Sequence, residues 1–278
     1  MTSGENIPEY DFSGQVAFVT GAARGQGRSH AVAYAEHGAD VVVTDICDSL
    51  ATADYPLGTT ADLEETAELI EREGQEALPL EMDVRDEAQV QAAVERAVEE
   101  FGRIDVLANN AGIWNLEYLH EMSEQQWDEM LDTDLKGVWL CSKHVAQHMI
   151  ERGEGGKIVS TASTAGHGAS YRGGHYTAAK HGVVGLTKSF AIELGQYDIN
   201  VNCVSPTGID SPMTRGLTEK YGQEAIAELN EYTGSWNVID EGPVESQDVT
   251  EAYLWLSSDA ARYVTGTAVA VDAGLMAK

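Results

Sequence analysis

A tyrosine and a lysine lie four residues apart in the segment HYTAAKHG, as Tyr176 and Lys180. On a helix this spacing places both side chains on one face. A tyrosine acts as a base near neutral pH only if its pKa falls by roughly 2 to 3 units, about 3 to 4 kcal/mol. A cation at about 4 Å contributes roughly 4 kcal/mol at an effective dielectric near 20. The pair therefore suits proton transfer, although an isolated pair with this spacing also arises by chance on protein surfaces.

Ser163 adds a hydroxyl to this pair. It ends an apolar segment and precedes Tyr176 by 13 residues. In open α/β folds, ligands bind outside the carboxyl ends of the strands, where both residues are expected. We therefore expect Ser163 to lie at the same ligand-binding edge of the sheet as the tyrosine–lysine pair.

A glycine-rich segment, TGAARGQG, follows the first apolar run and precedes a helical pattern. Gly21, Gly25 and Gly27 would let the backbone turn sharply and approach a pyrophosphate at a helix N-terminus. Asp45 ends the second apolar run, where a carboxylate can bind the ribose hydroxyls and repel a 2′-phosphate. Arg24 favours the opposite preference, but Asp45 is closer to the discriminating hydroxyl. The pattern predicts NAD rather than NADP.

Two further segments are candidates for cofactor contacts. Asp83 and Val84 follow the third apolar run and could reach the adenine, although Asp83 could instead cap a helix. The NNAG segment at 109–112 ends the fourth run, where the backbone would pass near the cofactor, although it could be an ordinary turn.

Apolar runs alternate with amphipathic helical patterns along the chain, which indicates an α/β fold with a parallel sheet covered on both faces. The predicted strands are residues 15–20, 40–45, 77–82, 104–110, 156–161, 200–205 and 268–272. The predicted helices are residues 25–37, 62–73, 86–101, 123–150 in one or two pieces, 174–194 and 247–257.

The chain is expected to form one dinucleotide-binding catalytic domain, residues 12–278, after a flexible tail at 1–11. Two segments interrupt the alternation. Residues 47–60 form an insertion after the second strand, and residues 207–244 form a long irregular excursion. Loops of this length are usually functional lids or mobile segments, so we expect the second to contact substrate.

The 278 residues include 46 acids and only 17 bases, a formal charge of −29. Such a surface repels itself at low salt and is screened at molar salt, which is typical of a salt-accumulating cytoplasm, although an ordinary acidic protein is the alternative. The charge disfavours nucleic acid and anionic membranes. No long apolar run or basic leader predicts a membrane span or secretion, and the three cysteines and eight histidines match no metal pattern.

Together TGAARGQG, NNAG, Ser163, YTAAK and the C-terminal YVTGTAVAVDAG resemble the short-chain dehydrogenase/reductase family. The resemblance implies a single Rossmann-type, doubly wound, parallel seven-stranded sheet and a homotetramer. It implies that Tyr176 is the general base or acid, that Lys180 is its partner and a ribose contact, and that Ser163 binds the reacting oxygen. It places the cofactor contacts at Gly21, Arg24, Gln26, Gly27, Asp45, Ile46, Asp83, Val84, Asn109, Ala111, Gly112, Tyr176, Lys180, Pro206, Ile209, Ser211 and Met213.

Asp134 departs from the family pattern, which has an asparagine that steadies a water in the proton relay to the lysine. An ionised aspartate accepts hydrogen bonds but cannot donate them. We expect Asp134 to pair with Lys180 and to weaken the effect of the lysine on Tyr176, which leaves the relay open but not the reaction class.

A narrower resemblance is to the mycofactocin-coupled, carveol dehydrogenase-like branch of the family. It implies oxidation of a secondary alcohol to a ketone, with NAD held so tightly that a redox carrier reoxidises it in place. The insertion at 47–60 would then cover the adenosine end of the cofactor. The residues proposed to line the substrate pocket are Trp114, Ser163, His167, Tyr176 and Trp236, and each aromatic side chain could equally lie in the core.

Three alternatives remain. The protein could be a general NAD(P)-dependent ketoreductase or a sugar or steroid dehydrogenase with freely exchanging cofactor. A nucleotide-sensing protein on the same fold would not need Ser163, Tyr176 and Lys180 together. A sugar-nucleotide epimerase shares the tyrosine–lysine spacing, but usually has another glycine pattern and a larger substrate domain.

Overall fold

The computed structural model describes residues 10–233, 237–239 and 244–277. Its centre is a seven-stranded parallel sheet, which confirms the predicted fold class, and the strand order is β3-β2-β1-β4-β5-β6-β7. The strands are β1 Val16–Thr20, β2 Asp40–Asp45, β3 Ala77–Glu81, β4 Val106–Asn109, β5 Gly156–Thr161, β6 Ile199–Pro206 and β7 Ala268–Val271. Phe18 of β1 pairs with Val42 of β2 on one side and with Leu107 of β4 on the other.

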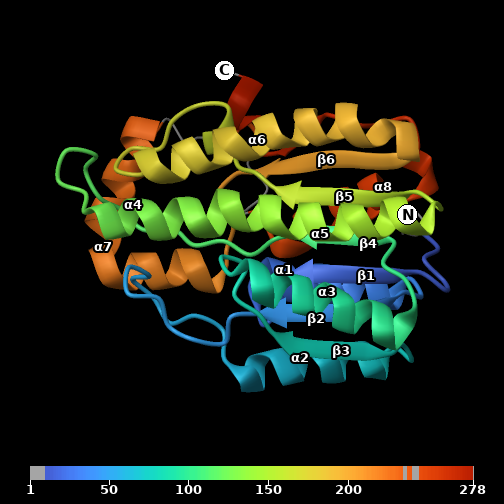
Figure 1. Ribbon diagram of the computed structural model, residues 1–278. Coiled ribbons are helices and arrows are strands. Elements are labelled where there is room, and N and C mark those ends of the chain that lie inside the picture. The colour runs from blue at the N-terminus through green and yellow to red at the C-terminus, as the bar shows by residue number, and fades with distance from the viewer. Residues whose placement is uncertain (1–9, 234–236, 240–243, 278) are drawn as a thin grey trace, which may run out of the picture.

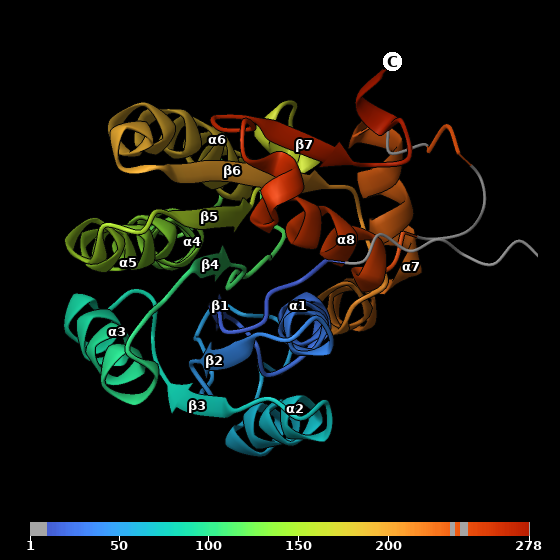
Figure 2. The same ribbon diagram turned by 90° about the vertical axis from the view of Figure 1, so that its right-hand side faces the viewer.

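Helices cover both faces of the sheet (Figures 1 and 2). They are α1 Gly25–Glu36, α2 Thr60–Arg72, α3 Glu87–Phe101, α4 Glu124–Leu131, α5 Gly137–Arg152, α6 Gly174–Leu194, α7 Pro212–Thr233 and α8 Ser246–Ser257. Figure 2 shows α1, α2 and α8 on one face and α3, α5 and α6 on the other. Each face has its own large apolar core. None of the helices in the described ranges is long and apolar enough to cross a membrane.

The order in which successive strands are added to the parallel sheet reverses between β1 and β4. From β1 the strands run outward through β2 to β3, and from β4 they run the other way. Open α/β sheets bind ligands at this point, outside the carboxyl ends of the strands. The fold therefore brings the ends of β1, β2 and β4 to one ligand-binding crevice.

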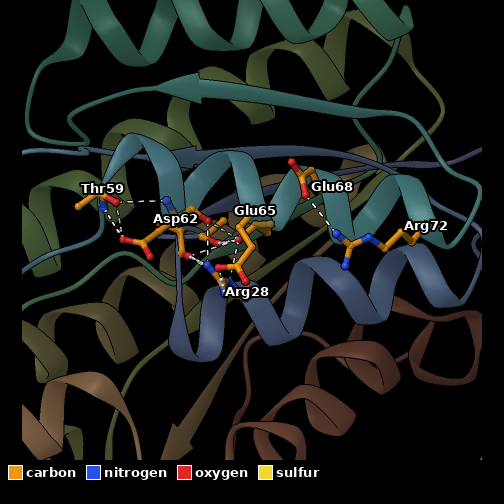
Figure 3. A network of polar contacts seen from close by, with 9 residues as sticks. Arg28, Thr59, Asp62, Glu65, Glu68 and Arg72 are labelled. Carbon is orange, nitrogen blue, oxygen red and sulfur yellow. Dashed lines mark hydrogen bonds and ion pairs between the residues drawn. The ribbon is translucent and has the colours of Figure 1, made fainter.

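A polar network fixes α2 against α1 and the glycine segment (Figure 3). The Arg28 guanidinium donates to the Ala23 carbonyl at 2.6 Å and to the Asp62 carbonyl at 2.8 Å, and it pairs with Glu65 at 2.7 Å. Thr59 and Asp62 form a reciprocal cap at the start of α2. These hydrogen bonds and ion pairs thus fix the glycine segment against α2.

One predicted segment differs in the structure, and another takes the second of its two predicted forms. The excursion at 207–244 is not irregular throughout, because α7 occupies 212–233 with a kink at Gly222, whose φ is 82°. Residues 123–150 form α4 and α5, joined by a π-helical turn, η1, at Asp132–Lys136. Most of the predicted tail lies outside the described residues, but Tyr10 packs edge-on against His37.

Candidate active site

Ser163, Tyr176 and Lys180 come together at the carboxyl end of β5. Ser163 begins a short 3₁₀ turn after this strand, and its hydroxyl accepts a hydrogen bond from the N–H of Ala165 at 3.1 Å. Tyr176 and Lys180 lie on α6, with the lysine Nζ 5.4 Å from the centroid of the tyrosine ring. The lysine is only 3% exposed. The pair is therefore not a chance surface pair.

Lys180 has two partners besides the tyrosine. Its Nζ donates to the Thr161 carbonyl at 2.9 Å and lies 3.1 Å from Oδ2 of Asp134. The expected ion pair between Asp134 and Lys180 is present. Asp134 raises the pKa of Lys180 despite the burial of both, so the lysine is charged at neutral pH.

The π-helical turn η1 carries Asp134 into the site. The other carboxylate oxygen of Asp134, Oδ1, accepts the backbone N–H of Ile113 at 2.8 Å. A Cβ atom on Gly112 would lie 2.9 Å from Oδ2 of Asp134, so the NNAG segment needs its glycine beside this carboxylate. Burial raises the pKa of Asp134, whereas Lys180 and the Ile113 N–H act to lower it.

The pKa of Tyr176 is raised in this structure, not lowered as the spacing suggested. Burial raises it most, Lys180 lowers it, Asp134 raises it, and the side chain of Ser163 lowers it. The direction of the lysine's effect agrees with the prediction. The net shift differs because the sequence does not reveal how much water the folded chain removes from the phenol.

The glycine segment forms a narrow backbone cradle between β1 and α1. A Cβ atom on Gly27 would lie 2.0 Å from the carbonyl oxygen of Gly21, and Gly21 has a φ of 65°. Oε1 of Gln26 is buried, with no hydrogen-bond partner in the described part of the chain. Only glycine fits where backbone segments approach this closely.

Asp45 lies at the end of β2 as predicted. Its Oδ2 accepts the N–H of Ala23 at 3.1 Å, and burial raises its pKa. Arg24 is the residue whose charge would favour binding of a 2′-phosphate. Its guanidinium contacts the Pro56 carbonyl in the insertion. Asp45 thus adjoins the cradle, while Arg24 is engaged by the insertion.

An open cleft of about 880 Å³ joins these groups. The predicted residues that line it are Gly21, Arg24, Gln26, Asp45, Ile46, Asp83, Val84, Ala111, Gly112, Ser211 and Met213. The predicted residues outside its lining are Gly27, Asn109, Tyr176, Lys180, Pro206 and Ile209. Segments that the sequence analysis singled out add further lining residues, namely Gly25 of the glycine segment, Asn110 of the NNAG segment, and Leu50, Tyr55, Leu57 and Gly58 of the insertion. The sequence analysis did not identify the other lining residues, which are Met82, Arg85, Ile113, Thr133 and Pro212.

Two predicted contacts have structural partners instead. The amide of Asn109 is buried and donates to Ser142 at 3.0 Å and to Ser160 at 3.1 Å, so it joins β4 to its neighbours. Asp83 pairs with Arg85 at 2.7 Å, which lowers the pKa of Asp83, and it still lines the cleft. Asp86, not Asp83, caps α3.

The insertion reaches farther than the adenosine end of the cleft. Its Tyr55 is buried, and the hydroxyl accepts the N–H of Trp114 at 3.1 Å. Leu50 packs with Ile113 and Met130 in an apolar cluster that Tyr176 also contacts. The insertion therefore extends from the cradle to the tyrosine.

The insertion also contacts α7, and the two lie side by side in Figure 1. Asp54 bonds to the Tyr221 hydroxyl and pairs with Lys220 at 3.5 Å. A Cβ atom on Gly216 would lie 2.4 Å from Cβ of Tyr55, so helix and loop approach closely. The insertion and α7 are the two segments that interrupt the alternation of strands and helices in the sequence. They thus pack against each other.

The proposed substrate residues divide into three cases. The ring of Trp114 lies 5.7 Å from the ring of Tyr176, and its Nε1 is buried without a partner in the described chain. His167 is exposed and its Nε2 bonds to the Ser205 hydroxyl at 3.0 Å, so it lies away from this cluster. Trp236 lies outside the described residues.

Comparison with known proteins agrees with this geometry. The family model described as enoyl-(acyl carrier protein) reductase matches residues 21–276. A (−)-trans-carveol dehydrogenase from Rhodococcus erythropolis is 42% identical over 272 residues, 95% of this chain and 98% of that one. The chain belongs to the short-chain dehydrogenase/reductase family.

Solved structures resemble this short-chain dehydrogenase/reductase over nearly its whole length. Carveol dehydrogenase from Mycobacterium avium in complex with NAD has a TM-score of 0.90 at 39% identity, covering 97% of this chain and 100% of that one. A short chain dehydrogenase from Mycobacterium paratuberculosis bound to NAD has a TM-score of 0.90 at 32% identity, covering 96% and 100%.

Proposed function

We propose that the protein is an oxidoreductase that moves a hydride between a secondary alcohol and NAD. The observation that carries the proposal is the cluster of Ser163, Tyr176 and Lys180 beside the dinucleotide cleft. A general acid or base must lie within reach of the proton that it transfers, and a partly buried phenol with a lysine and a serine around it meets this need.

The cofactor is NAD. The glycine cradle at Gly21 and Gly27 fits a pyrophosphate, and the buried, unpartnered Oε1 of Gln26 faces the same cleft. The carboxylate of Asp45 would bind the adenosine ribose and disfavour a 2′-phosphate. NAD supplies the hydride acceptor of the reaction. Two related structures are NAD complexes, which supports the same assignment.

The protein's own residues would orient the alcohol and move its proton. Ser163 and Tyr176 bind the hydroxyl, and Tyr176 accepts its proton as the alcohol carbon loses a hydride. Lys180 stabilises the phenolate electrostatically, since its charge lies 5.4 Å from the ring centroid. Leu50 and Ile113 exclude water from the phenol, which strengthens these interactions.

The substrate would bind against the rings of Trp114 and Tyr176, which favours an apolar secondary alcohol. Two similar proteins are named carveol dehydrogenases, which supports this class. A second candidate is a freely exchanging ketoreductase of wider specificity, because another relative, 34% identical, is a 3-oxoacyl-[acyl-carrier-protein] reductase from Thermotoga maritima.

NAD would be retained through turnover and reoxidised in place by a redox carrier such as mycofactocin. The support is the insertion, which covers the cleft with Tyr55 and Leu57 and is tied to α7 through Asp54. A loop that covers a bound ligand slows its dissociation. Differences in affinity between related complexes lie mainly in this off-rate. Dialysis that strips all NAD from the purified protein would contradict this part of the proposal.

The protein would assemble from copies of itself, as a homotetramer in a salt-rich cytoplasm. Trp139 of α5 is 40% exposed and Ile192 of α6 is 84% exposed, and both are costly to leave in water. Light scattering after size-exclusion chromatography at molar salt would give the mass, and a monomer would contradict the assembly.

Tyr176→Phe tests the central proposal. The variant loses the proton acceptor but keeps the ring and its packing, so alcohol oxidation should fall at least about 10²-fold while NAD remains bound. Tyr197→Phe, which changes a partly exposed hydroxyl outside the site, is the matched control. A Tyr176→Phe enzyme with near wild-type turnover would end the assignment.

A further inference from the structure

A buried ion pair lies against the tyrosine at the centre of the site. The side chains of Lys180 and Asp134 are 4% and 1% exposed, and their charged atoms are 3.1 Å apart. The remaining bonds of both side chains go to backbone groups: Asp134 accepts from Ile113, and Lys180 donates to Thr161. The two charges therefore compensate each other, and the net charge of the pair beside Tyr176 is zero.

A neutral pair stabilises a phenolate much less than a free lysine cation would. Lys180 attracts the negative charge of an ionised Tyr176, while Asp134 repels it. Burial works in the same direction as Asp134, because removing water disfavours the charged phenolate. Burial, the largest contribution, and Asp134 therefore favour the protonated hydroxyl, against Lys180 and the side chain of Ser163.

The other ionisable groups around this cluster do not change the balance. Tyr55 of the insertion faces Tyr176, and its own pKa is raised by burial, so it is uncharged at neutral pH. Cys203 of β6 faces Lys180, and burial raises its pKa too. Among the protein's own side chains, Asp134 of η1 and Lys180 of α6 are therefore the charges that decide how readily Tyr176 ionises.

We propose that Asp134 is a positioning residue that, through Lys180, holds Tyr176 in its proton-donating form up to alkaline pH. The site would then be set for ketone reduction at neutral pH and for alcohol oxidation only in more alkaline solution. In reduction the carbonyl carbon gains a hydride from NADH and its oxygen gains the Tyr176 proton. Solvent then reprotonates the phenolate. The inference rests on the proposed function, in which Tyr176 is the acid or base.

A purely structural role for Asp134 is the alternative. Its Oδ1 anchors the π-helical turn to Ile113, and an asparagine would keep this acceptor while removing the charge. Asp132→Asn is the matched control. It removes one carboxylate from the same turn, but Asp132 is half-exposed and pairs with Lys136 at 3.8 Å instead of with Lys180.

The direct test is the pH titration of Tyr176 by tyrosinate absorbance. Each enzyme is measured against the same enzyme carrying Tyr176→Phe, so that the difference reports this one hydroxyl. Asp134→Asn should shift the titration down by about 1 pH unit or more, the order expected for removing one nearby buried charge. Asp132→Asn should leave it in place.

Kinetics give a second measurement. In Asp134→Asn the acid limb of kcat/KM for alcohol oxidation should move to lower pH by the same amount. The alkaline limb for ketone reduction should move with it, because the protonated form is lost earlier. A structural role would lower the melting temperature or kcat without moving either limb.

Three results would overturn the inference. They are an unchanged Tyr176 titration in Asp134→Asn, an equal shift in Asp132→Asn, and a wild-type Tyr176 that titrates well below the value of free tyrosine, about 10. The last requires only Tyr176→Phe, and no Asp134 variant, to fold, and Asp134→Ser supplies a second neutral substitution. If Tyr176→Phe retains activity, the proposed function itself fails, whatever the titration shows.

Discussion

Replacement of Lys180 by methionine should leave Asp134 as a buried carboxylate without a counter-charge. Breaking a buried pair by removing one partner costs about 3 to 5 kcal/mol of unfolding free energy. The geometry gives the same order, since charges 3.1 Å apart interact by about 5 kcal/mol at an effective dielectric near 20. Lys180→Met should therefore be destabilised by about 3 to 5 kcal/mol at neutral pH.

The second substitution, Asp134→Asn, separates the charge effect from the loss of packing. Combined with Lys180→Met, Asp134→Asn removes the carboxylate that has no counter-charge. The unfolding free energy of the double variant should therefore exceed the sum expected from the two single variants by about 2 to 3 kcal/mol. Urea unfolding of all four proteins at constant salt measures this coupling.

The pH dependence has a definite sign. Without Lys180, burial leaves the folded-state pKa of Asp134 above its unfolded value, which is about 3.9. Such a group costs stability above the unfolded pKa, so the deficit of Lys180→Met should shrink as the pH falls toward about 4. A deficit that is independent of pH, or a coupling below about 0.5 kcal/mol, would refute the reasoning.

Three other predictions concern the cofactor and the surface. Asp45→Ala should weaken NAD and relax the discrimination against NADP by about 10-fold or more, measured as the ratio of the two kcat/KM values. Asp54→Asn should speed NAD release several-fold in a stopped-flow chase, because it frees the insertion from Lys220 and α7. Asp48→Asn, an exposed change in the same insertion, should not. The melting temperature should rise between 0.1 M and about 3 M KCl, because salt screens the charge of −29. A constant melting temperature would contradict the hypothesis that the protein is adapted to high salt.

Local patterns in the sequence were sufficient to predict the core of the fold. The strand at 156–161 and the helix at 174–194 have the predicted bounds, because each is a continuous apolar or helical segment with clear limits. The helix α7 was missed because Gly216 and Gly222 interrupt its pattern. Only two of its residues, Leu217 and Leu229, are buried.

Contacts between distant segments were the part of the site that sequence patterns could not predict. Nothing in the residues of the insertion indicates that Tyr55 meets Trp114, which is 59 residues away. The raised pKa of Tyr176 is a second case, because it depends on water removed by Leu50 and Ile113 as well as on the adjacent lysine. The spacing of Tyr176 and Lys180 predicted that the two side chains are partners. It did not predict whether burial or charge dominates the pKa of Tyr176.

If the insertion retains NAD as proposed, it would also link cofactor exchange to proton transfer. It touches Asp45 at its start, packs Leu50 into the cluster that contacts Tyr176, and is tied to α7 through Asp54. Any movement that opens the cleft wide enough for NAD to leave must also admit water to the phenol, because the same loop covers both. Hydration would remove the burial that raises the pKa of Tyr176 most. Under the proposed function, a closed insertion would keep both the cofactor in place and the tyrosine protonated, and an open one would release both constraints together.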